Sequence, residues 1–504
     1  MAAAGSLLVP AAERSLRLAP TLPDLFFALL LAAQFGRVDA WQGLLADGDT
    51  GWHIRTGDYI AAHGVPVSDL FSFSRAGQPW YAWEWLSDII FAYIHQWFGL
   101  PGVAALGAIL VCLAATLLFA WLLRRGAGAW VALPVTLAAT NAASVHNLAR
   151  PHLLSLVLLV AGLWLLDEDR RAATAWLWIL VPVTGLWANL HGGFAAWLAI
   201  LVFLAAGSAL ERNWIAWKRY GLLAGFAAMA TLINPYGWQL HRHIWEYLGS
   251  RWIARNVQEF QSPQIRSENM LVFAVLLLAG VAVAGKVCRR SQWFEPGLVA
   301  ICGFVALRSA RYVPIFAVVS APLLGAYAAR SWEDSACQSD ARGTSRVLWE
   351  SSRSLGARWQ LTAWMPILGA LALLAIFPSN GLWDFPARSF PVNAVAQNAG
   401  LLAGPARILT SDQWADYLIY RLYPRRRVFF DGRSDFYGED IGNDYRALMM
   451  AGRSCRDIMA RYGFTAALLP LDWPLGQVLE RDPSWRVAYR DGQAVLLVAE
   501  TGFK

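Results

Sequence analysis

The sequence predicts a polytopic helical membrane protein that carries a small α/β domain at its C-terminal end. Apolar residues make up 57% of the 504 positions and charged residues only 15%, a balance that a water-soluble fold would struggle to bury. The 27 Trp residues agree, because indole rings collect where hydrocarbon meets headgroups. The formal charge of +7 needs no nucleic-acid partner, since basic residues beside inner membrane ends fix the orientation and meet anionic lipid.

Long apolar stretches recur along most of the chain and predict an all-α bundle of about eleven transmembrane helices. They lie at roughly residues 22–38, 103–123, 129–145, 153–166, 175–190, 194–210, 221–233, 270–284, 294–307, 313–329 and 361–377. The five Cys residues are scattered without paired spacing, so neither a disulfide framework nor a zinc site is expected.

The segment 84–98 decides the topology, and it carries Glu84, Asp88 and His95. If it crossed the membrane, Arg124 and Arg125 would lie outside, against the usual excess of basic residues on the inner side. We therefore expect an amphipathic helix on the outer surface, with a companion around 53–63. The membrane domain is then 1–378, with a first outer loop at 39–101, and the outer domain is 379–504. The inner side receives the N-terminus with Arg14 and Arg17, and the later groups Lys286, Arg289 and Arg290.

In this topology the polar motifs between the apolar stretches fall on the outer side, and so do all eight His residues. Ionisable groups crowded at one end of a bundle indicate a shared polar cavity, and within membranes such groups are functional as a rule. The candidate site residues are Asp47, Asp49, His53, Arg55, Glu84, Arg150, His152, Asn189, His191, Asn234, Tyr236, Glu259, Arg308 and Arg311.

Each motif also has a purely structural interpretation. Residues 47–49 form a DxD pattern, which is common by chance in solvated loops. Residues 150–152 can simply start a helix, and residues 189–193 can close a tight turn. Arg308 and Arg311 share a helix face at the i, i+3 spacing, which also suits two end residues that reach for the interface.

The stretch DGDTGWHIRTGDYIAAHGVPVSDLFSFSRAGQPWYAWEWL, which begins at Asp47, resembles the first outer loop of bacterial members of the GT-C superfamily, glycosyltransferases that use polyprenyl-phosphate sugars. WADYLIYRL from Trp414 and FFDGRSDFYG from Phe429 resemble the outer tail of the same proteins. The likeness covers the first third of the chain well and the remaining spans by architecture only. The loop lacks the Asp-Glu pair and the His-Pro-Pro of better-known members, so substrate identity does not carry over.

The resemblance implies transfer of a sugar from a polyprenyl-phosphate-linked donor to a glycan, lipid or protein acceptor, at the outer face of a bacterial inner membrane. Asp49 or Asp47 would be the base for the acceptor hydroxyl, and the other would orient the acceptor or hold a divalent cation, Mg²⁺ or Mn²⁺. The implied phosphate ligands are His53, Arg55, Arg150, His152, His191, Arg308 and Arg311. The implied acceptor or secondary residues are Glu84, Asn189, Asn234, Tyr236 and Glu259.

From residue 383 onwards the composition changes to that of a small soluble domain. Strand-like runs occur at 406–410, 427–431 and 465–470, and a hairpin is expected at 485–499. Helical segments at 413–422, 443–462 and 474–481 alternate with them, which predicts a compact α/β fold. The loop after Phe430 is its most reactive-looking feature, although a turn in which Asp431 pairs with Arg433 is the simpler interpretation.

Three other functional classes remain open at this point. A secondary transporter should show internal repeats and ionisable groups near the bilayer midplane, whereas these polar groups lie at helix ends. A polysaccharide polymerase or ligase would use lipid-linked glycans at the same face, but its usual large outer loop lies late in the chain. A membrane scaffold without catalytic activity is the third class.

Overall fold

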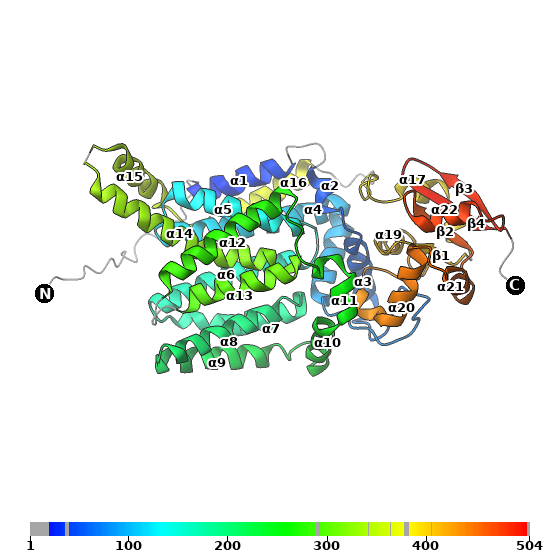
Figure 1. Cartoon of the computed structure of the whole chain (residues 1–504), viewed down its shortest axis with the longest axis horizontal. Coiled ribbons are helices and arrows are strands. Elements are labelled where there is room, and N and C mark those ends of the chain that lie inside the picture. The colour runs from blue at the N-terminus through cyan, green and yellow to red at the C-terminus, as the bar shows by residue number, and fades with distance from the viewer. Residues whose placement is uncertain are drawn as a thin grey trace.

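A computed structural model describes residues 20–35, 40–288, 293–340, 342–362, 364–376, 383–404 and 406–500. These parts form a helical bundle with a smaller mixed α/β portion at one end (Figure 1). The predicted domain boundary between 378 and 379 lies outside the described residues, as do Arg14, Arg17, Arg289 and Arg290.

Every apolar stretch that the sequence predicts to span a membrane contains a helix of the bundle. These helices are α1 (Leu22–Phe35), α4 (Trp85–Arg124), α5 (Ala129–Ala143), α6 (His152–Arg171), α7 (Leu180–Leu190), α8 (Phe194–Leu210), α9 (Trp214–Ala230), α12 (Glu268–Val287), α13 (Phe294–Arg308), α14 (Val313–Gln338) and α16 (Trp364–Ile376). Within the described ranges, three helices are long and apolar enough to cross a membrane by length and composition, namely Trp85–Arg124, Glu268–Val287 and Ala310–Gln338. The larger number of crossings stays a prediction.

The outward faces of several bundle helices are apolar. Leu278 on α12 is 73% exposed, Val275 on the same helix is 66% exposed, and Phe304 on α13 is 62% exposed. A belt of exposed aliphatic and aromatic side chains of this kind is unsuited to water and typical of a surface that faces another apolar phase. The bundle surface therefore agrees with the membrane class that the composition predicts.

Helix α4 is two helices joined at Gly99. This glycine has φ 63° and ψ −164°, a conformation that favours glycine, and Pro101 follows it. Residues 85–98 consequently lie across the end of the bundle, while the apolar part after Gly99 runs within it (Figure 1). The structure thus separates segment 84–98 from the following apolar helix, as the sequence predicts, while its depth relative to a membrane stays a prediction.

Helix α3 (Asp49–His63) is packed between α4 and α19 (Asp412–Leu422) through glycines. A Cβ atom on Gly51 would lie 2.8 Å from the Cβ atom of Tyr420 in α19, and one on Gly57 would overlap the carbonyl oxygen of Asp88 in α4. The companion helix expected around 53–63 is therefore present, but it is a buried layer between two other helices. Its N-terminal residue, Asp49, is therefore held in a fixed position next to α19 of the C-terminal domain.

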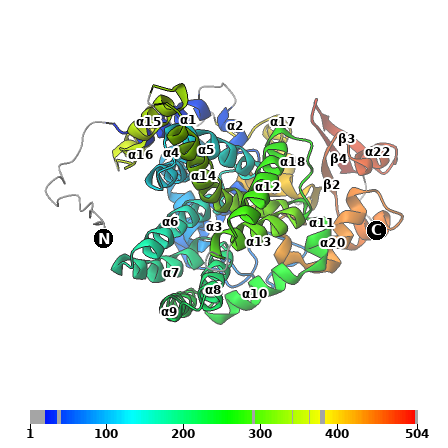
Figure 2. The ribbon, with the colours of Figure 1, turned by 60° about the vertical axis from the view of Figure 1, so that its left-hand side comes forward.

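Shorter helices connect the bundle to its surroundings. They are α2 (Ala40–Leu44), α10 (Trp238–Gly249), α11 (Arg251–Asn256) and α15 (Thr344–Gly356), with the 3₁₀ turns η1 (Ser144–His146), η2 (Ala175–Ile179), η3 (Gln258–Phe260) and η4 (Ala310–Tyr312). Figure 2 shows α10 and α11 leading from the bundle towards α20 (Ser434–Met449) of the C-terminal domain. The contact includes hydrogen bonds from His243 to Asp435 and from Trp252 to Asn443, both 2.9 Å long.

The C-terminal domain contains a four-stranded sheet in the order β1-β2-β4-β3. Strand β1 (Ile408–Thr410) is parallel to β2 (Ala466–Pro470), which is antiparallel to β4 (Ala494–Ala499), and β4 forms the predicted hairpin with β3 (Trp485–Arg490). The remaining helices are α17 (Val392–Gln397), α18 (Ala399–Ala403), α21 (Cys455–Tyr462) and α22 (Pro474–Glu480).

Two predicted elements of this domain were wrong. Residues 427–431 form no strand, because Val428 pairs only with Ser72 of the first outer loop in an isolated bridge. Residues 443–462 are not one helix, because the chain turns between α20 and α21 at Ala451, which has φ 50°. The expected pairing of Asp431 with Arg433 is confirmed at 2.6 Å.

One hydrophobic core joins the first outer loop to the C-terminal domain. It runs from Phe71 and Trp80 of the loop, through Trp414 and Tyr417 of α19, to Leu496 of the sheet. The loop and the tail are thus folded against each other, although more than three hundred residues separate them. Among the described residues all five Cys are free.

Replacing Gly57 by Ala should lower the stability of the whole protein, because the added methyl group collides with the Asp88 carbonyl. Overpacking of this kind costs about 1 to 3 kcal/mol. Gly225→Ala in α9 is the matched control, since a Cβ atom there meets nothing within 4 Å. Thermal unfolding in detergent should separate the two variants, and equal melting temperatures would contradict the close packing of α3.

Candidate active site

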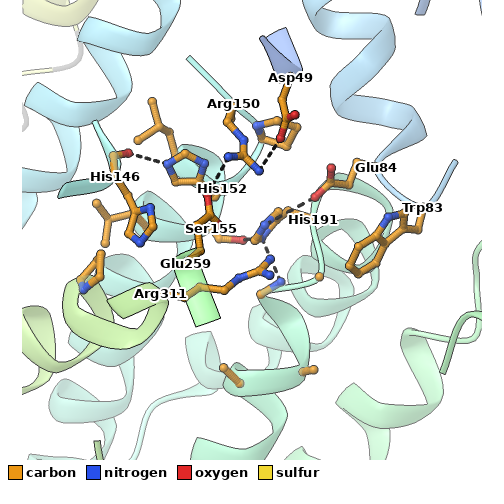
Figure 3. Close-up of a pocket in the computed structure, with 18 of the residues that line it drawn as sticks. Asp49, Trp83, Glu84, His146, Arg150, His152, Ser155, His191, Glu259 and Arg311 are labelled. Carbon is orange, nitrogen blue, oxygen red and sulfur yellow. Dashed lines mark hydrogen bonds and ion pairs between the residues drawn. The ribbon is translucent and has the colours of Figure 1, made fainter. Parts of the chain in front are cut away.

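A cavity of about 190 Å³ with many charged residues in its wall lies where the bundle, the first outer loop and the C-terminal domain meet. Figure 3 shows the charged and imidazole side chains gathered at its wall. The polar and aromatic residues that line it are Asp49, Trp52, Trp80, Trp83, Glu84, His146, Asn147, Arg150, His152, Ser155, Trp187, His191, Tyr247, Glu259, Arg311, Tyr312, Arg433, Ser434 and Asp435. Deeper in the bundle the wall becomes apolar, with Leu153, Leu156, Leu159 and Ile315.

Arg150 is the central cation of the site, and three carboxylates surround it. Its guanidinium lies 2.7 Å from Asp49, 3.1 Å from Asp47 and 2.8 Å from Glu259 (Figure 3 shows Asp49 and Glu259). A neighbouring hydrogen bond holds the two segments together: the hydroxyl of Thr50 donates to the carbonyl of residue 149 at 3.0 Å. One guanidinium therefore ties the DxD motif to the loop before α6 and to the loop after α11.

Asp49 faces a second buried carboxylate, that of Asp416 in α19. Oδ1 of Asp49 and Oδ2 of Asp416 are both buried without a hydrogen-bond partner in the described structure. Both point at Gly432, where a Cβ atom would overlap Asp49 and would lie 2.8 Å from Asp416. Burial raises the pKa of Asp49 to about 7 despite the opposing charge of Arg150. Burial, together with the charge of Asp49, raises the pKa of Asp416.

Glu84 lies between two imidazoles at the start of α4. Its carboxyl oxygens are 3.5 Å from Nε2 of His191 and 3.6 Å from Nε2 of His53. Burial raises the pKa of Glu84 to about 8, against the opposing charge of Arg150, so the group is mostly protonated at neutral pH. A neutral carboxyl can both donate and accept a hydrogen bond, which suits a position between two rings.

Both imidazoles are positioned by their other neighbours, and for His191 these neighbours also fix the tautomer. The backbone N–H of Gly193 donates to Nδ1 of His191 at 2.9 Å, so the proton of this ring is assigned to Nε2, towards Glu84. Ser155 receives the indole N–H of Trp187 at 2.6 Å and lies 2.7 Å from the same Nδ1. On the other side, Nδ1 of His53 is 2.6 Å from the carboxylate of Asp88.

Arg311 lines the cavity, whereas Arg308 does not. The prediction that both share a helix face was wrong, because α13 ends at Arg308 and Ser309 is extended, with φ −151°. The turn η4 then directs Arg311 inwards, where it donates to the hydroxyl of Tyr247 at 2.6 Å, while Arg308 stays exposed. Residue 310 also donates to the carbonyl of Gln261 at 2.9 Å, which joins this turn to the loop that carries Glu259.

Besides Arg308, six predicted site residues do not line the cavity, and four of these six have structural contacts away from it. Asn189 donates to the carbonyls of residues 185 and 233 and accepts from Trp85, which uses its hydrogen-bonding capacity between helices. Asn234 closes its own turn. Tyr236 and Arg55 bind backbone carbonyls, of Pro66 and residue 420 respectively. Asp47 and His53 do not line the cavity but contact residues that do. A motif places a residue in a loop, whereas tertiary contacts decide which side of the loop faces the cavity.

Several cavity residues were not among the predicted ones. Their sequence signals are weak: His146 belongs to the HNLARPH motif, and Arg433, Ser434 and Asp435 belong to a loop whose sequence is also that of a simple turn. Asp416 lies in an apolar-looking helix of the distant tail. Its contact with Asp49 depends on the packing of α19 against α3.

The side chains of the site do not form a recognisable cation site. Among the described residues, no group of three or more His, Cys, Asp or Glu side chains is arranged to hold a metal ion. Asp47 and Asp49, the expected ligands, instead share the guanidinium of Arg150. The unpartnered oxygens of Asp49 and Asp416 are only two possible ligand atoms, so no step is assigned to a metal, and a divalent cation stays a hypothesis.

The fold is similar to that of solved archaeal oligosaccharyltransferase structures. It is similar to the crystal structure of the oligosaccharyltransferase of Archaeoglobus fulgidus in the apo form, with a TM-score of 0.53 and 14% sequence identity over 89% of this chain and 69% of that chain. The same enzyme tethered to an acceptor peptide with an NVT sequon matches at 0.54 and 12% identity, over 89% and 68% of the two chains.

A further similar structure is AglB from the same organism in complex with an inhibitory peptide and a dolichol-phosphate. It matches with a TM-score of 0.51 and 14% identity, over 89% of this chain and 69% of that chain. No protein-family model and no curated protein sequence matches the chain. At such low identity the likeness establishes the fold, and the activity has to be argued from the site.

The raised pKa of Glu84 predicts how stability depends on pH. An unfolded Glu titrates near 4.5 and the folded group at about 8, so the stabilising contribution is complete below 4.5 and is lost as the pH rises to about 8. Glu84→Gln keeps a neutral side chain at every pH and should remove this loss. Melting temperatures of both proteins, measured across this range, should fall more steeply for the wild type, and parallel curves would mean that Glu84 is ionised in the fold.

Proposed function

We propose that the protein is a membrane glycosyltransferase that transfers a sugar from a polyprenyl-phosphate-linked donor to an acceptor. The observation that carries this proposal is the cavity at the end of the apolar bundle, in which Asp49, Glu84, Arg311 and Asp435 face one space. A reaction between a lipid-linked sugar and an acceptor from water needs such a site, polar at its mouth and apolar along the helices.

The acceptor would lose its proton to Asp49. Its oxygen or nitrogen attacks the anomeric carbon, the bond from that carbon to the phosphate oxygen breaks, and the phosphate leaves on its lipid. With a pKa of about 7, Asp49 is close to the value that suits a base at neutral pH. Its other oxygen is fixed by Arg150, so the free oxygen Oδ1 is the one available for the proton.

Arg311 is the best-placed ligand for the donor phosphate. It lines the cavity, and within the described ranges no carboxylate lies within 4.0 Å of its guanidinium. The rings of Tyr247 and Phe260, 5.5 and 5.2 Å from its central carbon, hold it in place. Arg150 is neutralised by its carboxylates, so it would organise the site, and His191 would contribute a ring N–H.

The lipid part of the donor would lie against the apolar wall of the cavity. Leu153, Leu156 and Leu159 follow one another along α6, and Ile315 in α14 lies on the same cavity. This arrangement continues from the charged mouth towards the middle of the helices. It suits a molecule with a phosphate at headgroup depth and a hydrocarbon chain beyond it.

The acceptor would enter from the side of the C-terminal domain. Ser434 and Asp435 of the C-terminal domain line the same cavity, and His243 fixes Asp435 at 2.9 Å. The acceptor, a glycan, lipid or protein, would reach the site from the outer face of a bacterial inner membrane. In this orientation the N-terminus is cytoplasmic and the C-terminal domain is periplasmic or extracellular.

Replacement of the base is the direct test. In a transfer assay with the full chain and a polyprenyl-phosphate sugar, Asp49→Asn should reduce turnover by on the order of 10² to 10⁴ while donor binding persists. The wild-type rate should fall as the pH drops below about 7, because Asp49 becomes protonated. Asp58→Asn is the matched control, since Asp58 lies on the same helix and pairs with Arg55 at 2.8 Å, outside the cavity. Full turnover of Asp49→Asn would place the base elsewhere, with Glu84 or Glu259 as the next candidates.

The two arginines around η4 make a paired test of the phosphate site. Arg311→Gln should weaken donor binding by about tenfold or more, because a buried charge-assisted hydrogen bond contributes roughly 1.5 to 3 kcal/mol. Arg308→Gln should leave it unchanged, because Arg308 is exposed and outside the cavity. Donor titration followed by intrinsic Trp fluorescence provides the measurement, and equal effects of the two substitutions would exclude Arg311 as the phosphate ligand.

A further inference from the structure

A second polar cavity lies at the end of the bundle opposite the C-terminal domain. Its volume is about 470 Å³, and the ends of α4, α6, α13, α14 and α15 enclose it. Figure 1 shows α15 at that end, far from the sheet. The cationic residues of its lining are Arg125, Arg170, Arg171, Arg330 and Arg353.

The carboxylates of this cavity are already engaged with part of these arginines. Glu295 lies 2.8 Å from Arg125 and 3.4 Å from Arg170, so two guanidiniums share one carboxylate. Asp167 lies 3.0 Å from Arg171. These acidic groups therefore leave no free negative charge for a further cation.

The remaining lining residues leave the cavity with an excess of positive charge. Glu333 lies 3.3 Å from Arg353. Arg330 is exposed, and in the part of the chain that the structure describes no carboxylate lies within 4.0 Å of it. Five guanidinium groups against three carboxylates leave two positive charges in a space that side chains do not fill. An anion fits this charge and this space.

Helix α15 indicates that the cavity lies at the depth of lipid headgroups. Its inner face packs on the bundle through Trp349 and Ser352, which are buried. Val347, Leu348 and Leu355 form a second, exposed apolar face. The third face is charged and includes Arg346, so the helix has the amphipathic pattern of one that lies in a membrane interface. A cavity that α15 covers is then level with phosphate groups rather than with open water.

We propose that this inner-end cavity binds the phosphate of an anionic lipid headgroup, held by Arg330 and by Arg170, whose carboxylate partner Glu295 is shared with Arg125. The inference rests on the membrane placement in the proposed function, although not on the transfer reaction. Guanidinium groups are suited to phosphate because their planar donors match two oxygens at once. Basic pockets between helices on the cytoplasmic side are known sites for such headgroups.

The full chain in detergent, titrated with phosphatidylglycerol and followed by native mass spectrometry, tests the proposal. Arg330→Gln should weaken binding by about tenfold, which corresponds to about 1.4 kcal/mol. Arg346→Gln is the matched control, because Arg346 pairs with Glu350 on the charged face of α15 and does not line the cavity. Arg170→Gln, a second variant on another helix, should weaken the binding of phosphatidylglycerol as well. Phosphatidylcholine, which carries no net charge, should bind more weakly than phosphatidylglycerol to the wild type.

Each other outcome overturns the proposal. Equal binding by Arg330→Gln and Arg346→Gln would show that the cavity is not the lipid site, and displacement of the lipid by equimolar inorganic phosphate would make it a site for free phosphate. The transfer assay separates this proposal from the proposed function. Arg330→Gln lies far from Asp49 and should keep full turnover, so loss of lipid selectivity and loss of transfer are independent results.

Discussion

The close packing of α3 between α4 and α19 is the constraint on which the rest of the structure depends. Gly51 and Gly57 let the helix approach its neighbours closely, because a Cβ atom at either position would collide with α19 or α4. Asp49 stands at the N-terminal end of this helix and is therefore fixed relative to both partners. An outer loop and a distant tail thus become one wall of the cavity, sharing one hydrophobic core.

The carboxyl groups around the cavity differ in their ionisation, because their charged neighbours differ. Arg150 neutralises the carboxylates of Asp47 and Glu259 and one oxygen of Asp49, and it does so from a loop that three separate segments contact. Glu84 has no such partner, and its burial raises its pKa to about 8. Carboxyl groups of the same site therefore differ in charge: Asp47 and Glu259 are ionised beside Arg150, whereas Glu84 is mostly neutral. Catalytic carboxyl pairs in other enzymes differ in the same way.

The two ends of the bundle use charge differently. At the end near the C-terminal domain, carboxyl groups and imidazoles face an enclosed space, and the cations are mostly neutralised. At the other end, guanidiniums exceed carboxylates and line a more open cavity beside an amphipathic helix. Because of this difference in charge, the two cavities suit different ligands.

The sequence by itself determined the membrane class, the positions of the apolar helices, the separate segment at 84–98 and the hairpin at the C-terminal end, because these follow from local composition and periodicity. It also predicted Asp49, Arg150 and His191 as site residues, and the structure places all three at the cavity. Only the tertiary structure decided that Arg311 faces the cavity and Arg308 does not, since one extended residue, Ser309, rotates the chain between them. The contact of Asp49 with Asp416 likewise depends on packing between distant helices, which no local pattern encodes.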